Sequence, residues 1–101
     1  MDNRQFRNLL LRKSYNFFLG VVKLCLNLRK NKLLIPIADQ LLRSAASIGA
    51  NIAEAQGSAS KREFKNFIHH GFKSCWETRY WLSLINDAEL VSDKKLEGLI
   101  S

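Results

Sequence analysis

The first third of the chain constrains the fold most, because its apolar residues recur with the period of an α-helix. We predict a helix over residues 3–29, capped by Asp2 with Gln5 at the third helical position. At about 100° per residue, its apolar side chains cover an arc of about 220°. One bundle core needs a much narrower arc. We therefore expect the extra surface to be covered by a second partner, most simply another subunit.

The rest of the chain has the same helical periodicity. Pro36 fits the first turn of a helix, and Ser60 with Glu63 forms the pattern of a capping box. No segment shows the alternation of a β-strand, and 101 residues are enough for a single domain. We therefore predict one all-α domain over residues 1–101 with a short or truncated fourth helix. The predicted helices cover residues 3–29, 36–56, 61–88 and 93–100.

The chain is basic, and the excess charge lies in its first segment. There are 16 Lys and Arg residues against 9 Asp and Glu residues, which gives a net charge of +7. Residues 1–35 contain 8 basic residues and 1 acidic residue. A basic helix indicates an anionic partner such as nucleic acid, although a solvated surface that aids solubility is an equal alternative. The candidate nucleic-acid-binding residues are Arg4, Arg7, Arg12, Lys13, Lys23, Arg29, Lys30 and Lys32.

The second predicted helix has a polar stripe between two packing surfaces. Unpaired buried charge is costly, so we expect these polar groups to find partners on other helices, with Glu77 paired to Arg43. The alternative is a groove or ring lumen lined for a ligand. The predicted polar network consists of Gln40, Arg43, Ser47, Asn51, Glu54 and Glu77.

Another side of this helix carries only small residues. Because glycine costs about 1 kcal/mol of helix stability relative to alanine, we expect close packing to explain Gly49. The small side consists of Ala46, Gly49, Ala50 and Ala53.

The third predicted helix carries aromatic residues at helical spacing outside its core stripe. Phe72, Trp76 and Tyr80 follow Lys65 and His69 at intervals of three and four residues. We expect the three aromatic residues to form an interface with another subunit or a partner protein. Stacking on single-stranded nucleic acid is the alternative.

We find no residue pattern of an enzyme or a metal site. His69 and His70 are adjacent, so on a helix they point about 100° apart and cannot share one metal ion. Cys25 and Cys75 lack the spacing of a zinc site and are expected to be reduced packing residues. We therefore predict a protein that is not an enzyme and has no metal and no cofactor. The lack of a recognisable signal peptide or membrane-length apolar run predicts a cytoplasmic protein without a membrane partner.

Four stretches together carry a resemblance to a known family. Residues 40–56 read QLLRSAASIGANIAEAQ, residues 60–64 read SKREF, residues 77–82 read ETRYWL and residues 14–17 read SYNF. In this order and spacing they resemble the 23S rRNA intervening-sequence proteins, over about residues 6–92.

The resemblance implies an antiparallel up-down-up-down four-helix bundle that assembles into small rings, pentameric in described members. The family is encoded in insertions within bacterial 23S rRNA genes and elsewhere, and no catalytic residues carry over from it. A related branch, the accessory protein of diversity-generating retroelements, binds a reverse transcriptase and nucleic acid. We therefore expect a homo-oligomeric bundle that binds RNA, or alternatively a protein-interaction module such as an accessory subunit of a reverse transcriptase.

Overall fold

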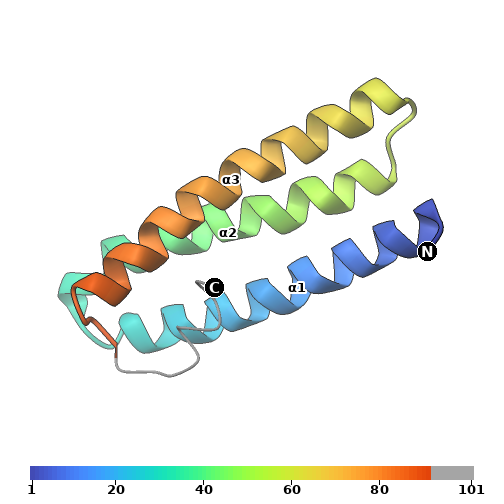
Figure 1. Ribbon diagram of the computed structural model, residues 1–101. Helices are drawn as coiled ribbons and strands as arrows, with labels where there is room; N and C mark the ends of the chain where they lie inside the picture. The colour runs from blue at the N-terminus through green and yellow to red at the C-terminus, as the bar shows by residue number, and fades with distance from the viewer. Residues whose placement is uncertain (92–101) are drawn as a thin grey trace.

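In the computed structural model of this protein, which describes residues 1–91, three long α-helices run up, down and up beside one another (Figure 1). No strand occurs among these residues. The predicted helix over residues 93–100 lies outside the described residues. The helices are α1 (Asn3–Leu28), α2 (Ile35–Gln56) and α3 (Lys61–Asp87), and a 3₁₀ turn, η1 (Lys32–Leu34), precedes α2.

The helix ends are fixed by short-range hydrogen bonds. The backbone N–H of Gln5 donates to Asp2 Oδ1 at 2.8 Å, and the N–H of Asp2 donates to Gln5 Oε1 at 2.9 Å. At the start of α3, the N–H of Glu63 donates to Ser60 Oγ at 3.1 Å. The carboxylate of Glu63 accepts from the N–H of Ala59 at 3.3 Å, one residue before the partner that a capping box predicts.

The hydrophobic core lies in one half of the bundle, where α2 packs against both α1 and α3. Each side chain of this size adds about 1.5–3 kcal/mol when it is fully buried. The largest fully buried apolar side chains are Val21, Leu28, Leu41, Leu82 and Ile85.

Toward the other end the predicted core is only partly formed. Phe6 of α1 is 56% exposed, and Phe64, Phe67 and Ile68 of α3 are half-buried. Both α1 and α3 pack mainly on α2 rather than on each other, so their facing sides lack a covering layer among the described residues.

Gly49 does not have the packing that we expected. A Cβ atom added at this position would meet no atom within 4 Å. The close contact is at Gly71 of α3, where an added Cβ would lie 3.5 Å from Asn51 Cβ and 3.6 Å from the carbonyl oxygen of Ile48. The prediction of close packing at Gly49 was therefore wrong within the described part of the chain, because no neighbouring side chain or helix reaches this position.

Candidate nucleic-acid interface

Two basic residues of α1 lie on the same outer side of the helix. Arg12 and Lys23 are exposed and 11 residues apart, which is about three turns or 16 Å. Lys30 is also exposed and follows directly after the end of α1. Neither Arg12, Lys23 nor Lys30 forms an ion pair within residues 1–91. We call these three residues the outer basic row.

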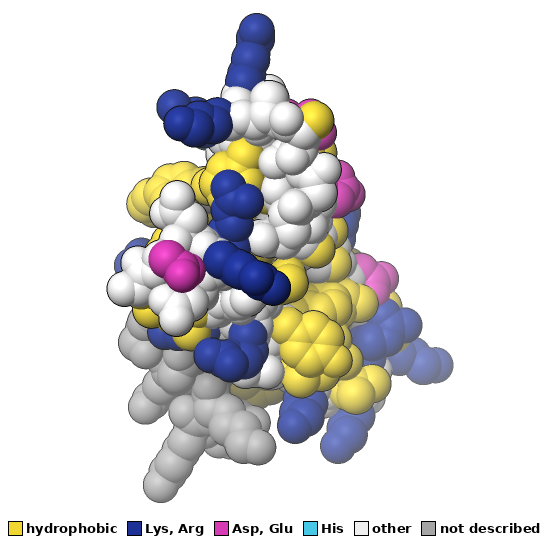
Figure 2. All heavy atoms as spheres, turned by 90° about the vertical axis from the view of Figure 1, so that its right-hand side faces the viewer, with side chains coloured by type: hydrophobic (Ala, Val, Ile, Leu, Met, Phe, Trp, Pro, Cys, Tyr) yellow, Lys and Arg dark blue, Asp and Glu magenta, His cyan; other side chains and the backbone are white. Residues whose placement is uncertain are grey.

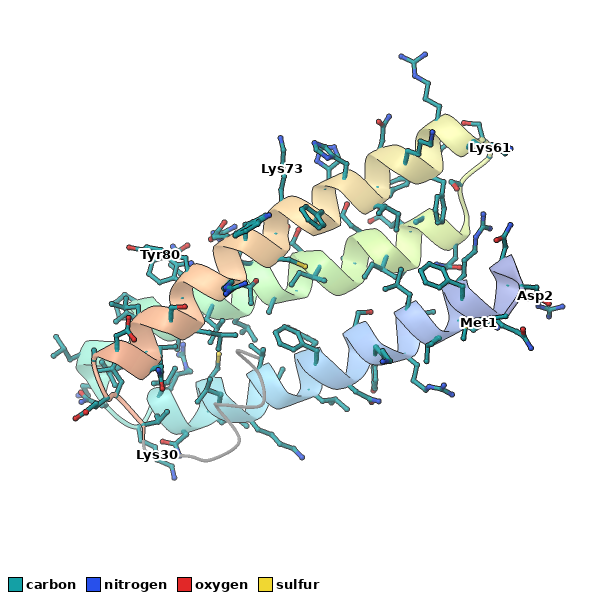
Figure 3. All side chains as sticks on the ribbon, in the orientation of Figure 1. Met1, Asp2, Lys30, Lys61, Lys73 and Tyr80 are labelled. Carbon is teal, nitrogen blue, oxygen red and sulfur yellow. The ribbon has the colours of Figure 1, made fainter. Side chains whose placement is uncertain are left out.

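The other predicted basic residues lie in different environments. Arg29 pairs with Asp39 of α2 at 2.5 Å, so its charge is already compensated. Lys13 lines a groove between the helices, and Lys32 belongs to η1. Arg4 and Arg7 lie at the opposite end of α1 from Lys30, which Figure 3 labels. The eight candidates therefore do not form one surface.

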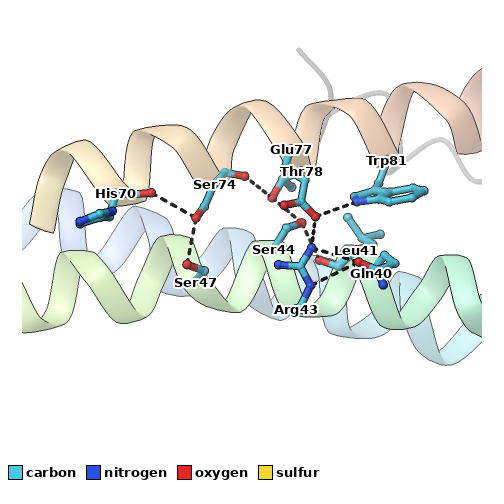
Figure 4. A network of polar contacts seen from close by, with 10 residues as sticks. All are labelled: Gln40, Leu41, Arg43, Ser44, Ser47, His70, Ser74, Glu77, Thr78 and Trp81. Atoms are coloured by element: carbon cyan, nitrogen blue, oxygen red, sulfur yellow. Dashed lines mark hydrogen bonds and ion pairs between the residues drawn. The ribbon is translucent and has the colours of Figure 1, made fainter.

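The polar stripe of α2 meets α3 at a partly exposed seam rather than in the core. Arg43 forms an ion pair with Glu77 and also donates from Nη2 to Gln40 Oε1 at 3.0 Å (Figure 4). Glu77 in addition accepts from Trp81 Nε1 at 3.1 Å. The side chains of Arg43 and Glu77 are 58% and 38% exposed, so this pair avoids the full cost of burying charge.

Two hydroxyl contacts continue this seam between α2 and α3. Ser74 Oγ donates to Ser47 Oγ at 2.9 Å, and Thr78 Oγ1 donates to Ser44 Oγ at 2.9 Å. Figure 4 shows the row of contacts linking the two helices. Ser44 and Thr78, which the sequence analysis did not place in the network, have small side chains that fit into the helix contact.

Two predicted members of the network, Asn51 and Glu54, form no hydrogen bond or ion pair with α3 among the described residues. Asn51 donates to the carbonyl oxygen of Ser47 at 2.8 Å and therefore bonds within its own helix. Glu54 is exposed, and within residues 1–91 its carboxylate has no hydrogen-bond or ion-pair partner.

The aromatic residues of α3 form an exposed row on the side turned away from α2. Phe72, Trp76 and Tyr80 are 61–63% exposed. The rings of Phe72 and Trp76 pack edge to face with their centroids 6.5 Å apart. We call these three residues the aromatic row. An apolar row of this kind is unusual on a free surface.

An apolar groove of about 340 Å³ lies between all three helices. Its lining comes from one side of each helix. Arg79 of α3, which the sequence analysis did not select, lies in this groove with Lys13. The lining residues are Leu10, Lys13, Ser14, Phe17, Ile48, Ile52, Cys75, Thr78, Arg79 and Leu82.

Comparison with known proteins agrees with this arrangement. Residues 7–101 match the family described as 23S rRNA-intervening sequence protein. The chain belongs to this family. The matched range contains every candidate residue named above except Arg4.

A solved relative of this 23S rRNA-intervening sequence protein has the same helical arrangement. It is described as the crystal structure of a protein with unknown function from the S23 ribosomal protein family of Bacteroides thetaiotaomicron. The two chains are 33% identical with a TM-score of 0.85, and the similarity covers 93% of this chain and 84% of the relative. No match to a curated protein was found.

The remaining reactive side chains of this family member are its two cysteines and its acidic and histidine residues. Among residues 1–91, no group of three His, Cys, Asp or Glu side chains could hold a metal ion. Both thiols are free, and burial raises the pKa of Cys25 to about 11, with the negative charge of Asp39 adding to the effect. Burial against the groove also raises the pKa of Cys75.

Among residues 1–91, no helix is apolar over a sufficient length to cross a bilayer.

Proposed function

We propose that this protein is a non-enzymatic, homo-oligomeric helical bundle that binds RNA through basic residues of α1. The observation that carries the proposal is the outer basic row, whose three cations are exposed and have no acidic partner within residues 1–91. Uncompensated cations along an exposed helix attract the phosphates of a nucleic acid. The family description, which refers to 23S rRNA, makes RNA the first choice of nucleic acid.

A pair of double variants tests the role of the outer basic row. Arg12→Ala/Lys23→Ala removes one arginine and one lysine from α1, and Lys73→Ala/Arg79→Ala removes the same two residue types from α3. Binding of a fluorescent single-stranded RNA is measured by anisotropy over a range of salt concentrations. Since each phosphate contact on a single strand contributes about 0.7 to the slope of log K against log salt, the first variant is expected to lower this slope by about 1.4.

The α3 variant is expected to keep the slope of the unmodified protein. RNA binding that is undetectable at low salt, or that does not change with salt, would overturn the proposed function. An equal loss in both double variants would also contradict it, because α1 would then have no special role.

The four-helix bundle is the second part of the proposal. After α3 the chain reverses at Glu89, which has a φ of 54°, and the N–H of Leu90 donates to the carbonyl oxygen of Ile85 at 3.0 Å. Leu90 and Val91 then contact the core. This return supports the short fourth helix that the sequence predicts for residues 93–100.

Substitutions in residues 93–100 test this placement. Leu96→Ala is expected to lower the free energy of unfolding by about 2 kcal/mol or more if the side chain fills the groove. Lys94→Ala is the neighbouring control and is expected to change it by less than about 0.5 kcal/mol. Equal effects of the two substitutions in urea denaturation would reject the fourth helix.

The homo-oligomer is the third part of the proposal, and two different apolar surfaces support it. The aromatic row lies on α3, while Tyr15, Leu19 and Leu26 are exposed on the outer side of α1. A contact between two unlike surfaces of identical chains is head-to-tail, and such contacts form a ring when the rotation between neighbouring subunits closes. This arrangement fits the ring, pentameric in related proteins, that the family resemblance implies.

Mixing two assembly-deficient variants tests the head-to-tail contact. Trp76→Asp damages the α3 surface and Leu26→Asp damages the α1 surface, so each variant alone is expected to remain a monomer in light scattering. Their mixture retains one intact contact and is expected to form a dimer. A monomeric unmodified protein would overturn the oligomer and favour the protein-interaction module, with a reverse transcriptase as a partner to test. A mixture that stays monomeric would reject the head-to-tail contact.

A further inference from the structure

A cleft at one end of the bundle brings together cations from segments that are far apart in the sequence. It has a volume of about 440 Å³ and lies where α1 begins beside the turn from α2 to α3. Figure 3 shows Met1, Asp2 and Lys61 at this same end. The lining residues are Arg7, Ser58, Ala59, Ser60, Lys61, Phe64 and Lys65.

The position of Arg7 in this cleft is fixed by an aromatic contact. The guanidinium carbon of Arg7 lies 4.4 Å from the centroid of the Phe64 ring. A guanidinium over an aromatic face is held in place by a cation–π interaction, and its N–H groups at the edge remain free to donate. Arg7 is half-buried, whereas the other cations of the cleft are exposed.

The cations of the cleft are not neutralised by acidic residues in the described part of the chain. Arg7, Lys61 and Lys65 form no ion pair there. The nearby carboxylate of Glu63 accepts a hydrogen bond from the N–H of Ala59 and is held by the start of α3. Figure 2, which looks onto this end of the molecule, shows Lys and Arg side chains spread across it.

We propose that this cleft binds the phosphodiester backbone of a single-stranded RNA, with Arg7, Lys61 and Lys65 as its phosphate contacts. This inference rests on the proposed RNA binding and adds a site that the outer basic row does not include. Arg7 presents a fork of donors that matches two oxygens of one phosphate. Lys61 and Lys65 lie one helical turn apart and add two point charges beside it.

The arrangement favours a chain of phosphates over a single small anion. Three cations from two helices surround an open cleft, so more than one phosphate is needed to neutralise them. Ser60 also lines the cleft, and its hydroxyl, which accepts the N–H of Glu63, keeps its own proton to donate to a phosphate or ribose oxygen. The contacts involve the backbone of the nucleic acid, so the cleft is expected to bind RNA of different sequences with similar affinity.

The double variant Lys61→Ala/Lys65→Ala tests the cleft, because both lysines are exposed and their loss leaves the stacking of Arg7 on Phe64 in place. The matched control is Lys73→Ala/Arg79→Ala, which removes the same charge from the same helix. Anisotropy with a labelled single-stranded RNA is expected to show a slope of log K against log salt that falls by about 1.4 in the cleft variant only. Circular dichroism checks that both variants keep their helices.

A second variant and a second probe complete the test. Arg7→Ala is expected to lower RNA affinity further when it is combined with the cleft variant. Titration with inorganic phosphate, followed by NMR shifts of the amides of Ser58 and Ala59, is expected to show weak binding that RNA displaces.

The possible outcomes show whether this inference fails alone or together with the proposed function. If RNA binds and only Arg12→Ala/Lys23→Ala weakens it, the cleft is rejected while the proposed function stands. If inorganic phosphate binds in the cleft and RNA binds only elsewhere on the protein, the cleft is a site for small anions and the inference is overturned. If RNA binding is absent altogether, both fail.

Discussion

Thr78 of α3 and Ser44 of α2 place their hydroxyl oxygens 2.9 Å apart inside the contact between the two helices. Both residues are almost completely buried, at 2% and 1% exposure. The hydroxyl of Ser44 in turn donates a hydrogen bond to the carbonyl oxygen of Leu41 at 3.2 Å. A polar pair thus lies within an otherwise apolar contact without leaving a buried polar atom unsatisfied in residues 1–91.

This pair predicts a measurable coupling between the two helices. Thr78→Val and Ser44→Ala each remove the bond between the two hydroxyls and one further bond to a backbone carbonyl oxygen, that of Ser74 for Thr78 and that of Leu41 for Ser44. At about 0.5–1.5 kcal/mol per bond, each is expected to lower the free energy of unfolding by about 1–3 kcal/mol. The double variant is expected to lose less than the sum, since neither remaining side chain then lacks its partner. Urea denaturation of the four proteins measures the difference, and losses that add within about 0.3 kcal/mol would show that the hydroxyls act independently.

The core predicts a large difference between two leucines near the connection from α1 to α2. Leu28 is 1% exposed and Leu33 is 79% exposed. Leu28→Ala is expected to lower the free energy of unfolding by about 2–5 kcal/mol, because it leaves a cavity in the core. Leu33→Ala, the control with the same loss of atoms, is expected to change it by less than about 0.5 kcal/mol in the same measurement. Similar losses in the two variants would contradict the placement of the core.

The surroundings of Gly49 and Gly71 predict that a larger side chain will change the free energy of unfolding in opposite directions at the two positions. Gly49→Leu is expected to raise the free energy of unfolding by up to about 1 kcal/mol, because leucine is the better helix former and the space beside Gly49 is open. Gly71→Leu is expected to destabilise the protein, because its side chain would meet Asn51 and Ile48 on α2. Thermal unfolding measures both changes. Destabilisation by Gly49→Leu, with a change in oligomeric mass, would instead place Gly49 in a contact between subunits.

The thiol of Cys25 predicts a loss of stability at alkaline pH. Burial raises its pKa from 9.0 to about 11, so the folded state holds the proton over a range in which the unfolded state releases it. The free energy of unfolding therefore contains a contribution that is fully present below about pH 9 and is lost as the pH rises toward about 11.

This contribution is measured by comparing Cys25→Ala with its parent, both in a Cys75→Ala background under reducing conditions. The difference in their free energies of unfolding is expected to shrink from pH 8 to pH 11. A difference that stays constant would contradict the raised pKa, because other titrating groups are common to both proteins.

Local signals explain why the helices could be predicted. The predicted starts at residues 3 and 61 and the end at residue 56 are observed, and the other three ends of the first three helices differ by a single residue. Asp2, Gln5 and Ser60 bond to backbone groups three residues away, so their effect does not depend on the rest of the fold. The resemblance in residues 40–56, 60–64 and 77–82 likewise pointed to the family that the comparisons show.

Helical periodicity alone did not decide which apolar residues are buried. Phe6 and Leu24 are both apolar residues of α1, yet Phe6 is exposed and Leu24 is buried. The period gives the direction of a side chain around its own helix, but burial also requires close packing of a neighbouring helix at the same height. Leu24 lies in the half of the bundle that holds the core, whereas beside Phe6 the contact of α1 with α3 involves Arg7 and Phe64 and leaves an open cleft.

The sequence by itself determined three helices, their ends and a basic first segment, because caps, periodicity and charge are properties of neighbouring residues. Only the tertiary structure decided which of those charges are free. Arg29 is compensated by Asp39, whereas Arg7 stacks on Phe64 beside Lys61, 57 and 54 residues further along the chain. Such contacts depend on the distance and angle between helices, which the packing of the whole chain sets and no local pattern encodes.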